Sequence, residues 1–270
     1  MSDDRFIELN QAQPSLDLPE ATAPAQTGDD EKPIIQPAIE RALQRKPWPP
    51  RKGKLWVSNV TKCPRQVMMR CLAYAPTDTF GAKTLGYFRL GNVYEEDTAQ
   101  LLRAAFGTTR IQTQIKVQSP FWSGKMDVVI DHRGAVPIVV EHKATGDRWW
   151  NYEGNLPKLD HLAQLCLYGA LYEEQFGQAP VLILYYRSWG HWAEFQAEVW
   201  PGFVTVEGWI DGEVVKRDIG LDVAEERRTL EAWHERQELP PRPLDHVDGC
   251  LFQGEPGCLY YGNCWPEAVR

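Results

Sequence analysis

Two short apolar runs stand close together in the chain, Met126-Asp127-Val128-Val129-Ile130 (residues 126–130) and Val136-Pro137-Ile138-Val139-Val140-Glu141-His142-Lys143 (residues 136–143). Valine and isoleucine favour strands, so the pattern predicts two strands of a buried sheet. Asp127, Glu141 and Lys143 place charges in these runs. Because a bare charge is costly to bury, these three side chains need partners, and they are the first candidates for a functional site.

The charged residues of the two runs suit one kind of chemistry. Two carboxylates brought together repel each other, and a divalent cation is their natural partner. Lys143 points to the same strand face as Glu141, since side chains alternate with period 2. Metal, carboxylates and ammonium together suit the attack of a metal-activated water on a phosphodiester. The alternative is a set of solvated charges at strand ends, so further features have to decide.

Length and composition limit the class of protein. A chain of 270 residues with 43% hydrophobic residues supports one domain with a sizeable core, plus appendages. It contains no run of 18 apolar residues, which predicts no membrane span. The acidic N-terminus lacks the apolar stretch of a secretory signal, so we expect a cytoplasmic protein. In that setting six cysteines favour a metal or redox role over a disulfide framework.

Charge is distributed unevenly along the chain. Residues 1–40 carry nine acidic and two basic residues, and their composition predicts a disordered acidic tail. Residues 41–70 contain no acidic residue and nine basic ones: Arg41, Arg45, Lys46, Arg51, Lys52, Lys54, Lys62, Arg65 and Arg70. This basic block could bind phosphates through counterion release, and the alternative is a solvated basic face. We therefore divide the chain into the tail (1–40), a core (41–240) and a C-terminal cysteine segment (241–270).

Hydrophobic periodicity predicts an α/β core with a mixed β-sheet flanked by helices. The expected helices are 60–74, capped by Ser58, then 91–106 and 156–176. The expected strands are 112–118, 126–130, 136–143, 181–187 and 192–199. Residues 203–237 are expected to be mainly helical, and the remaining C-terminal residues form loops.

Two of the expected helices carry polar residues that suit a site. Glu95 lies on the apolar side of helix 91–106 and Glu96 on the wet side. A metal ion could partner Glu95; the alternative is an ordinary salt bridge at the boundary. Gln164 and Tyr168 project together from helix 156–176, with His161 one turn earlier. An amide and a phenol can brace a lysine, a carboxylate or a phosphate by hydrogen bonds, although many such pairs form only a polar helix edge.

The cysteines separate into two groups. Four of them lie in or beside loop-like sequence: Cys63, Cys250, Cys258 and Cys264. Three clustered thiols with a distant fourth could bind zinc or a 4Fe–4S cluster, and either would join the C-terminus to the first helix. The spacing does not choose between these metals. Cys71 and Cys166 lie in apolar helical sequence and are expected to be packed thiols.

Taken in order, these features resemble the PD-(D/E)-x-K nuclease superfamily, in its RecB-like iron–sulfur branch. That branch includes the CRISPR-associated RecB-like exonucleases and the AddB nuclease domain. The resemblance covers residues 58–264 and rests on Cys63-Pro64-Arg65, Gly91-x3-Glu95, Gly124-Lys125-Met126-Asp127, Glu141-His142-Lys143, Gln164-x3-Tyr168 and the trio Cys250, Cys258 and Cys264. Glu95 stands where the family often has histidine, and seven residues separate Cys250 from Cys258 where two are common.

The resemblance implies a restriction-endonuclease-like core and a metal-dependent DNA exonuclease that prefers single-stranded ends. It implies Mg²⁺ or Mn²⁺ on Glu95, Asp127, Glu141 and the backbone carbonyl of His142. The implied catalytic residues are Asp127, Glu141, Lys143, Gln164 and Tyr168. It further implies a structural 4Fe–4S cluster on Cys63, Cys250, Cys258 and Cys264. Expected partners are DNA and proteins of recombination or CRISPR adaptation, or a second copy of the chain.

Two other classes stay open at this stage. One is a catalytically silent DNA-binding or adaptor protein that keeps an iron–sulfur or zinc site. The other is a nuclease whose cysteines bind zinc in place of iron and sulfide.

Overall fold

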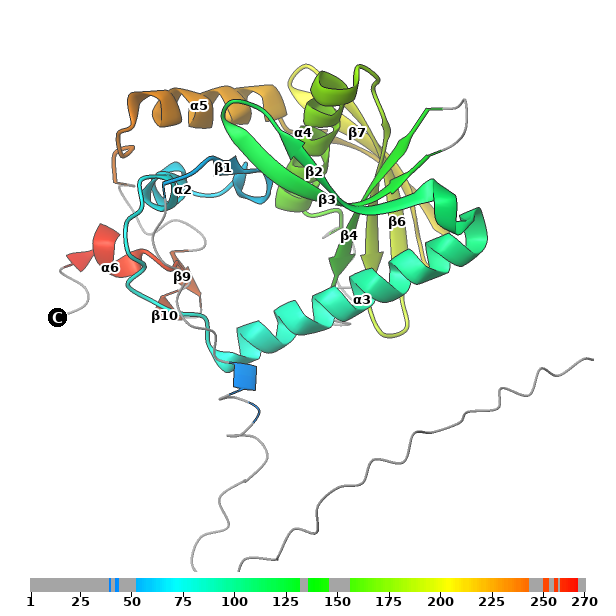
Figure 1. Ribbon diagram of the computed structural model, residues 1–270, viewed down its shortest axis with the longest axis horizontal. Coiled ribbons are helices and arrows are strands. Elements are labelled where there is room, and N and C mark those ends of the chain that lie inside the picture. The colour runs from blue at the N-terminus through cyan, green and yellow to red at the C-terminus, as the bar shows by residue number, and fades with distance from the viewer. Residues whose placement is uncertain are drawn as a thin grey trace, which may run out of the picture.

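The computed structural model describes residues 39, 42–43, 52–131, 136–145, 156–242, 250–252, 255–256 and 258–266. The predicted acidic tail lies outside the described residues, apart from Ile39. Within them, an eight-stranded mixed sheet is flanked by helices (Figure 1). The predicted α/β class with a mixed sheet is therefore confirmed. None of the described helices is both long and apolar enough to cross a membrane.

The large sheet is built from eight strands. These are β1 (Leu55–Trp56), β2 (Ile111–Gln118), β3 (Trp122–Ile130), β4 (Ile138–Ala144), β5 (Val181–Arg187), β6 (Trp192–Trp200), β7 (Phe203–Ile210) and β8 (Glu213–Gly220). Their order is β1-β3-β4-β5-β6-β7-β8, and β2 pairs with β3. β1 runs parallel to β3 and β4 parallel to β5, whereas the other pairs are antiparallel. A parallel pair needs a crossover connection. Between β4 and β5 this connection contains the helix Leu159–Phe176, whose residues from Leu162 to Gly169 are all buried.

Helices cover both faces of this sheet. The described helices are α2 (Pro64–Cys71), α3 (Ala82–Phe106), α4 (Leu159–Phe176), α5 (Val223–Arg236) and the short α6 (Tyr261–Cys264). α4 packs on one face of the sheet and α3 on the other. Two 3₁₀ turns, η1 (Val57–Asn59) and η2 (Thr108–Arg110), and a small hairpin of β9 (Leu251–Phe252) and β10 (Glu255–Pro256) complete the described elements. Figure 1 shows α3 running along the side of the sheet opposite to α4.

The two faces of the sheet have separate cores. On one face Leu165 and Leu167 of α4 pack in the main cluster with Leu184 and Phe195 of the sheet, all of them fully buried. On the other face Ala99 of α3 contacts a smaller cluster that includes Val128 and Val140. Successive side chains of β4 point to opposite faces of the sheet. Val139 therefore lies in the core beneath α4, and Val140 lies in the core beneath α3.

The prediction of mainly helical structure in 203–237 is wrong for its first half. Residues 203–220 form the hairpin of β7 and β8, while the helix begins at Val223. Val204 and Val206 alternate inward with full burial, which is a strand pattern. Asp211 and Gly212 turn the chain with φ of 49° and 92°, as a two-residue hairpin requires. The Asp-Gly pair was the sequence signal for this turn.

Three helix starts also differ from the prediction. The helix expected at 156–176 begins at Leu159, since the proline at position 157 disfavours the helical conformation of the residue before it. The first helix begins at Pro64, with Cys63 in place of Ser58 at its N-cap, because proline is favoured in the first helical turn. Ser58 belongs to the preceding 3₁₀ turn. The second helix begins at Ala82, nine residues before the predicted start at 91, and runs through two glycines.

Candidate active site

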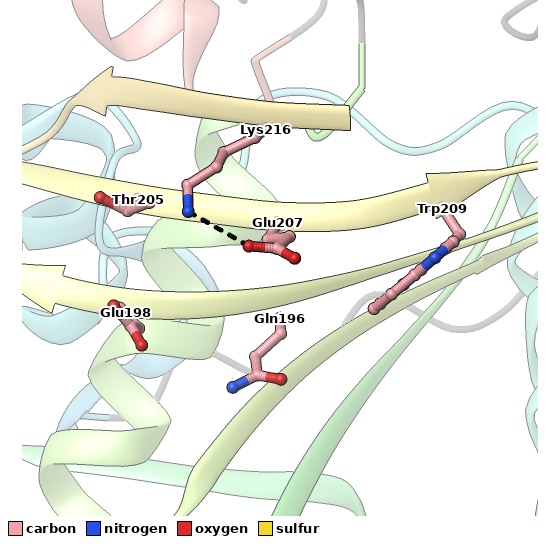
Figure 2. A pocket seen from close by; sticks show the side chains of 6 residues that line it. All are labelled: Gln196, Glu198, Thr205, Glu207, Trp209 and Lys216. Carbon is pink, nitrogen blue, oxygen red and sulfur yellow. Dashed lines mark hydrogen bonds and ion pairs between the residues drawn. The ribbon is translucent and has the colours of Figure 1, made fainter. Parts of the chain in front are cut away.

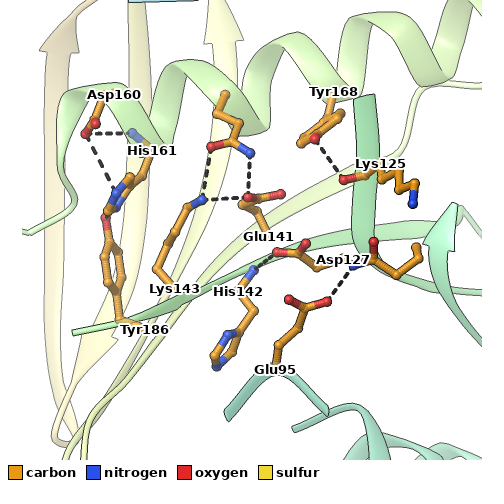
Figure 3. Close-up of polar contacts among 12 residues, drawn as sticks. Glu95, Lys125, Asp127, Glu141, His142, Lys143, Asp160, His161, Tyr168 and Tyr186 are labelled. Carbon is orange, nitrogen blue, oxygen red and sulfur yellow. Dashed lines mark hydrogen bonds and ion pairs between the residues drawn. The ribbon is translucent and has the colours of Figure 1, made fainter. Parts of the chain in front are cut away.

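The pairing of β3 with β4 brings the two charged runs together. Val128 lies opposite Val140 and Val129 opposite Val139, so Asp127 comes next to the Glu141–His142 peptide. The backbone N–H of His142 donates a hydrogen bond of 2.9 Å to Asp127 Oδ2 (Figure 3). Asp127 and His142, which are fifteen positions apart in the chain, thus share one small region of the sheet.

Glu141, Lys143 and Gln164 form a closed hydrogen-bonded triangle. Lys143 Nζ donates to Glu141 Oε1 at 2.7 Å and to Gln164 Oε1 at 3.0 Å. Gln164 Nε2 donates to the same Glu141 Oε1 at 2.7 Å. Glu141 is only 1% exposed and Gln164 only 8% exposed. Both ends of the glutamine amide are therefore used to hold the lysine against the carboxylate.

Tyr168 supports the site through the backbone of β3. Its hydroxyl donates a hydrogen bond of 2.8 Å to the carbonyl of Lys125, two residues before Asp127. Burial, followed by the charges of Glu141 and Asp127, raises the pKa of Tyr168, so the phenol stays protonated and remains a donor. The structure therefore places Tyr168 one turn beyond Gln164, where it fixes the strand that carries Asp127.

Glu95 approaches the carboxylates from α3 (Figure 3). Its Oε1 accepts a hydrogen bond of 2.6 Å from Gln114 Nε2 of β2. Gln114 has a φ of 55°, a backbone conformation that is uncommon for a residue with a side chain. Sequence analysis missed Gln114, because no local pattern signals a left-handed residue inside a strand. Glu95 is half-buried and Glu96 exposed, as the helix periodicity predicted.

Electrostatics shows that the carboxylates share one environment. Burial, then the charges of Glu141 and Glu95, raise the pKa of Asp127 well above its ordinary value, against the opposing charge of Lys143. Burial also raises the pKa of Glu141, and Lys143 opposes this increase. For Lys143 burial lowers the pKa, but Glu141 and Asp127 outweigh it and the pKa is raised. Glu95, Asp127 and Glu141 thus act on one another, and the single ammonium group of Lys143 beside Glu141 leaves an excess of negative charge.

The site has donors that fit a divalent cation. Glu141 Oε2 is buried and accepts no hydrogen bond from the residues that the structure describes. Such an oxygen is costly to leave unpaired, and a cation would satisfy it. Carboxylate oxygens are the ligands that Mg²⁺ and Mn²⁺ prefer. In their present positions, no group of three or more His, Cys, Asp or Glu side chains in the described residues is arranged to hold a metal ion.

His142 presents its backbone to the carboxylates, not its ring. The imidazole is buried beside Tyr185, with 5.8 Å between ring centroids. Burial, followed by the charges of Arg187 and Lys143, lowers the pKa of His142 to about 4, so the ring is neutral at pH 7. The main-chain N–H of His142 therefore faces Asp127, while its side chain packs in the core.

The two groups of cysteines occupy different places. Cys250, Cys258 and Cys264 are buried in a satellite cluster with Met69 and three aromatic residues, and Cys63 is half-buried. Burial, followed by the charges of Cys250, Cys264 and Cys63, raises the pKa of Cys258 to about 11. Cys71 and Cys166 belong to the main core, so their prediction as packed thiols is confirmed. All six cysteines lie within the described residues, and none forms a disulfide there.

Three hydrogen bonds hold the described part of residues 240–262 against the region around α2. Thr77 N donates to Leu259 O at 2.8 Å, and Gly262 N donates to Thr77 Oγ1 at 3.0 Å. Arg65, which follows Cys63-Pro64, donates to the carbonyl of Pro240 at 2.6 Å. These contacts bring the sequence near Cys63 and the sequence near Cys258 into one region.

A glycine in β3 gives a test of the Tyr168 contact. A Cβ at Gly124 would lie 2.6 Å from Tyr168 Cε1 and 2.8 Å from Val57 Cγ2. Gly124→Ala is therefore expected to lower the free energy of unfolding by about 1–3 kcal/mol and to weaken the Tyr168–Lys125 hydrogen bond. Urea unfolding measures the change. The control is Gly91→Ala in α3, whose Cβ would meet only Ala144 Cβ at 3.9 Å. Equal stability of the two variants would contradict this reading.

The chain was compared with protein families, curated proteins and solved structures. No protein-family model matches the chain, and no curated protein matches it. Among solved structures, the chain is similar to one titled "Crystal structure of SSO0001", with 17% sequence identity and a TM-score of 0.45. The match covers 86% of this chain and 96% of that chain.

Proposed function

We propose that this protein is a metal-dependent DNA nuclease that hydrolyses phosphodiester bonds, acting as an exonuclease on single-stranded ends. One observation carries the proposal. A buried carboxylate, Glu141, holds Lys143 in a triangle with Gln164, while Asp127 and Glu95 lie alongside. A half-buried lysine with surplus carboxylates beside it suits a site where a cation and a phosphate meet.

The proposed cation ligands are Glu95, Asp127, Glu141 and the backbone carbonyl of His142, for one or two Mg²⁺ or Mn²⁺ ions. The buried, unpartnered Oε2 of Glu141 and the raised pKa of Asp127 support this choice. A bound ion would supply Lewis acidity and a nucleophilic water at neutral pH.

The chain's own residues have separate tasks in this proposal. Lys143 keeps its proton, because Glu141 and Asp127 raise its pKa, and it would offset negative charge developing on the phosphate. Gln164 fixes the ammonium group through its amide oxygen. Tyr168 holds the β3 backbone and thereby the position of Asp127. Since both helper residues come from α4, one rigid element sets the geometry of the two strands.

We also propose a structural 4Fe–4S cluster on Cys63, Cys250, Cys258 and Cys264, with zinc as the alternative metal. Thiolates are the ligands of both. The three buried C-terminal thiols and the electrostatic influence of Cys63 on Cys258 support a shared site. Such a cluster would join the start of α2 to the C-terminal segment.

The test is an assay on an end-labelled single-stranded oligonucleotide with Mg²⁺, Mn²⁺ or EDTA. We expect cleavage with either ion and none with EDTA. A circular single strand distinguishes the two modes, because an exonuclease leaves it intact. The matched control is Glu141→Gln, which keeps the side-chain shape and removes the charge. Binding without cleavage above the Glu141→Gln level would instead support the adaptor class.

A further inference from the structure

A second polar cluster lies beside the triangle, where the chain enters α4. Lys62 Nζ contacts Asp160 Oδ2 at 3.0 Å, across 98 positions of sequence. His161 follows Asp160 and lies one turn before Gln164, so it projects on the same side of the helix. Lys143, Lys158 and Lys62 all act electrostatically on His161. The cluster is thus continuous with the proposed catalytic lysine (Figure 3).

The hydrogen bonds of Tyr186 define the state of His161. The Tyr186 oxygen accepts the backbone N–H of Lys158 at 3.0 Å and lies 3.0 Å from His161 Nδ1. Tyr186 is fully buried, so its own hydrogen needs an acceptor, and His161 Nδ1 provides one. The proton of the neutral ring then belongs on Nε2. Burial, followed by the charge of Lys143, lowers the pKa of His161 to about 3, which keeps the ring a neutral donor.

Lys62 differs from three other described members of the basic block, Lys54, Arg65 and Arg70. Lys54 donates to the carbonyl of Ser119 at 2.5 Å, and Arg65 donates to the carbonyl of Pro240. Arg70 lies over the ring of Trp56 at 4.9 Å. These contacts hold the fold together locally. Lys62 instead reaches the start of α4, next to the proposed site.

We propose that Lys62, Lys158 and His161 bind the backbone phosphate that neighbours the scissile one, and that Asp160 holds Lys62 until the nucleic acid arrives. The inference rests on the proposed function and adds a substrate-binding subsite to it. The Lys62 and Asp160 side chains are 47% and 37% exposed, and an ion pair of this exposure contributes little stability. A phosphate, with more charge and more acceptor atoms than one carboxylate, can therefore take over Lys62.

The proposal predicts opposite effects for the two members of the ion pair. In EDTA, which prevents cleavage, Lys62→Gln should weaken binding of a fluorescent single-stranded oligonucleotide. It should also reduce the slope of log affinity against log salt by about 0.7. Asp160→Asn should strengthen binding, because it releases Lys62. If the pair were merely structural, the two variants would change stability together and leave the salt slope unchanged.

A control on the far strands separates a local contact from a change in net charge. Lys216 pairs with Glu207 at 3.2 Å on the β7–β8 hairpin, in a shallow polar hollow of about 270 Å³ (Figure 2). Lys216→Gln and Glu207→Gln repeat the two charge changes there. We expect both to leave affinity and slope unchanged. Equal effects at the two pairs would overturn the proposal, and so would weaker binding by Asp160→Asn.

His161 provides a further arm of the test. His161→Leu should weaken binding several-fold, and His161→Gln should retain more affinity because its amide can still donate. Equal binding by these two variants would remove His161 from the subsite. All these binding measurements are made in EDTA, without Mg²⁺ or Mn²⁺. The subsite can therefore be refuted while cleavage by the native protein still succeeds. Absence of oligonucleotide binding by the native chain would overturn the subsite as well.

Discussion

Replacing Lys143 by alanine is expected to reduce Mg²⁺-dependent cleavage by at least about 100-fold, the scale of losing one group that stabilises charge in the transition state. Oligonucleotide binding should change much less, because the loss is concentrated in the chemical step. Single-turnover cleavage at saturating protein, together with binding in EDTA, separates the two effects. Near-native cleavage by Lys143→Ala would contradict the assignment.

The stability of this variant needs its own control. Lys143 is the ammonium partner of Glu141, whose carboxylate is 1% exposed. Leaving one partner of a buried pair typically costs about 3–5 kcal/mol, so Lys143→Ala could lose activity by unfolding. The double variant Glu141→Gln with Lys143→Met removes both charges and keeps the shapes. It should recover most of the stability lost in Lys143→Ala, which would trace that loss to the unpaired Glu141 charge. Urea unfolding of Lys143→Ala itself shows whether the variant is still folded under the conditions of the cleavage assay.

Serine at Cys63, Cys250, Cys258 or Cys264 is expected to abolish the brown colour of the anaerobically purified protein and to lower its melting temperature. Cys166→Ser and Cys71→Ser should retain the colour, since both thiols lie in the main core and a 4Fe–4S cluster needs four thiolates. The visible spectrum, the iron and zinc content and a thermal melt measure the outcome.

These cysteine variants also distinguish the metals. A colourless native protein with one bound zinc would replace the cluster by a zinc site while keeping the same four ligands. A brown protein that loses its colour in Cys166→Ser and keeps it in Cys250→Ser would show that the wrong four thiols were chosen. Because Cys166 is 3% exposed in α4, its serine variant also reports how much stability a core thiol alone contributes.

Much of the candidate site follows from local sequence patterns. The apolar runs around Asp127 and Glu141 fold as β3 and β4, and alternation places Glu141 and Lys143 on one face. Helical spacing places Gln164 and Tyr168 on one side of α4, where Gln164 contacts Glu141 and Lys143. Strand side chains repeat with a period of two residues and helix side chains with a period of 3.6. A stretch of a few residues is therefore enough to predict which side chains share a face.

Other features could not be derived from such windows. The antiparallel hairpin at 203–220 contains helix-compatible residues, and pairing with β6 decided its structure. The contact of Gln114 with Glu95 requires a left-handed residue in β2, which depends on how α3 lies against the sheet.

The sequence by itself determined the α/β class, the strands that carry Asp127, Glu141 and Lys143, and the buried places of Cys71 and Cys166. The tertiary structure alone decided that Lys62 reaches Asp160, that Tyr168 holds the Lys125 carbonyl, and that Glu141 keeps one buried oxygen unpaired. The physical reason is the range of the interactions. Local periodicity reflects the backbone geometry of neighbouring residues, whereas these contacts depend on the register and packing of elements far apart in the chain.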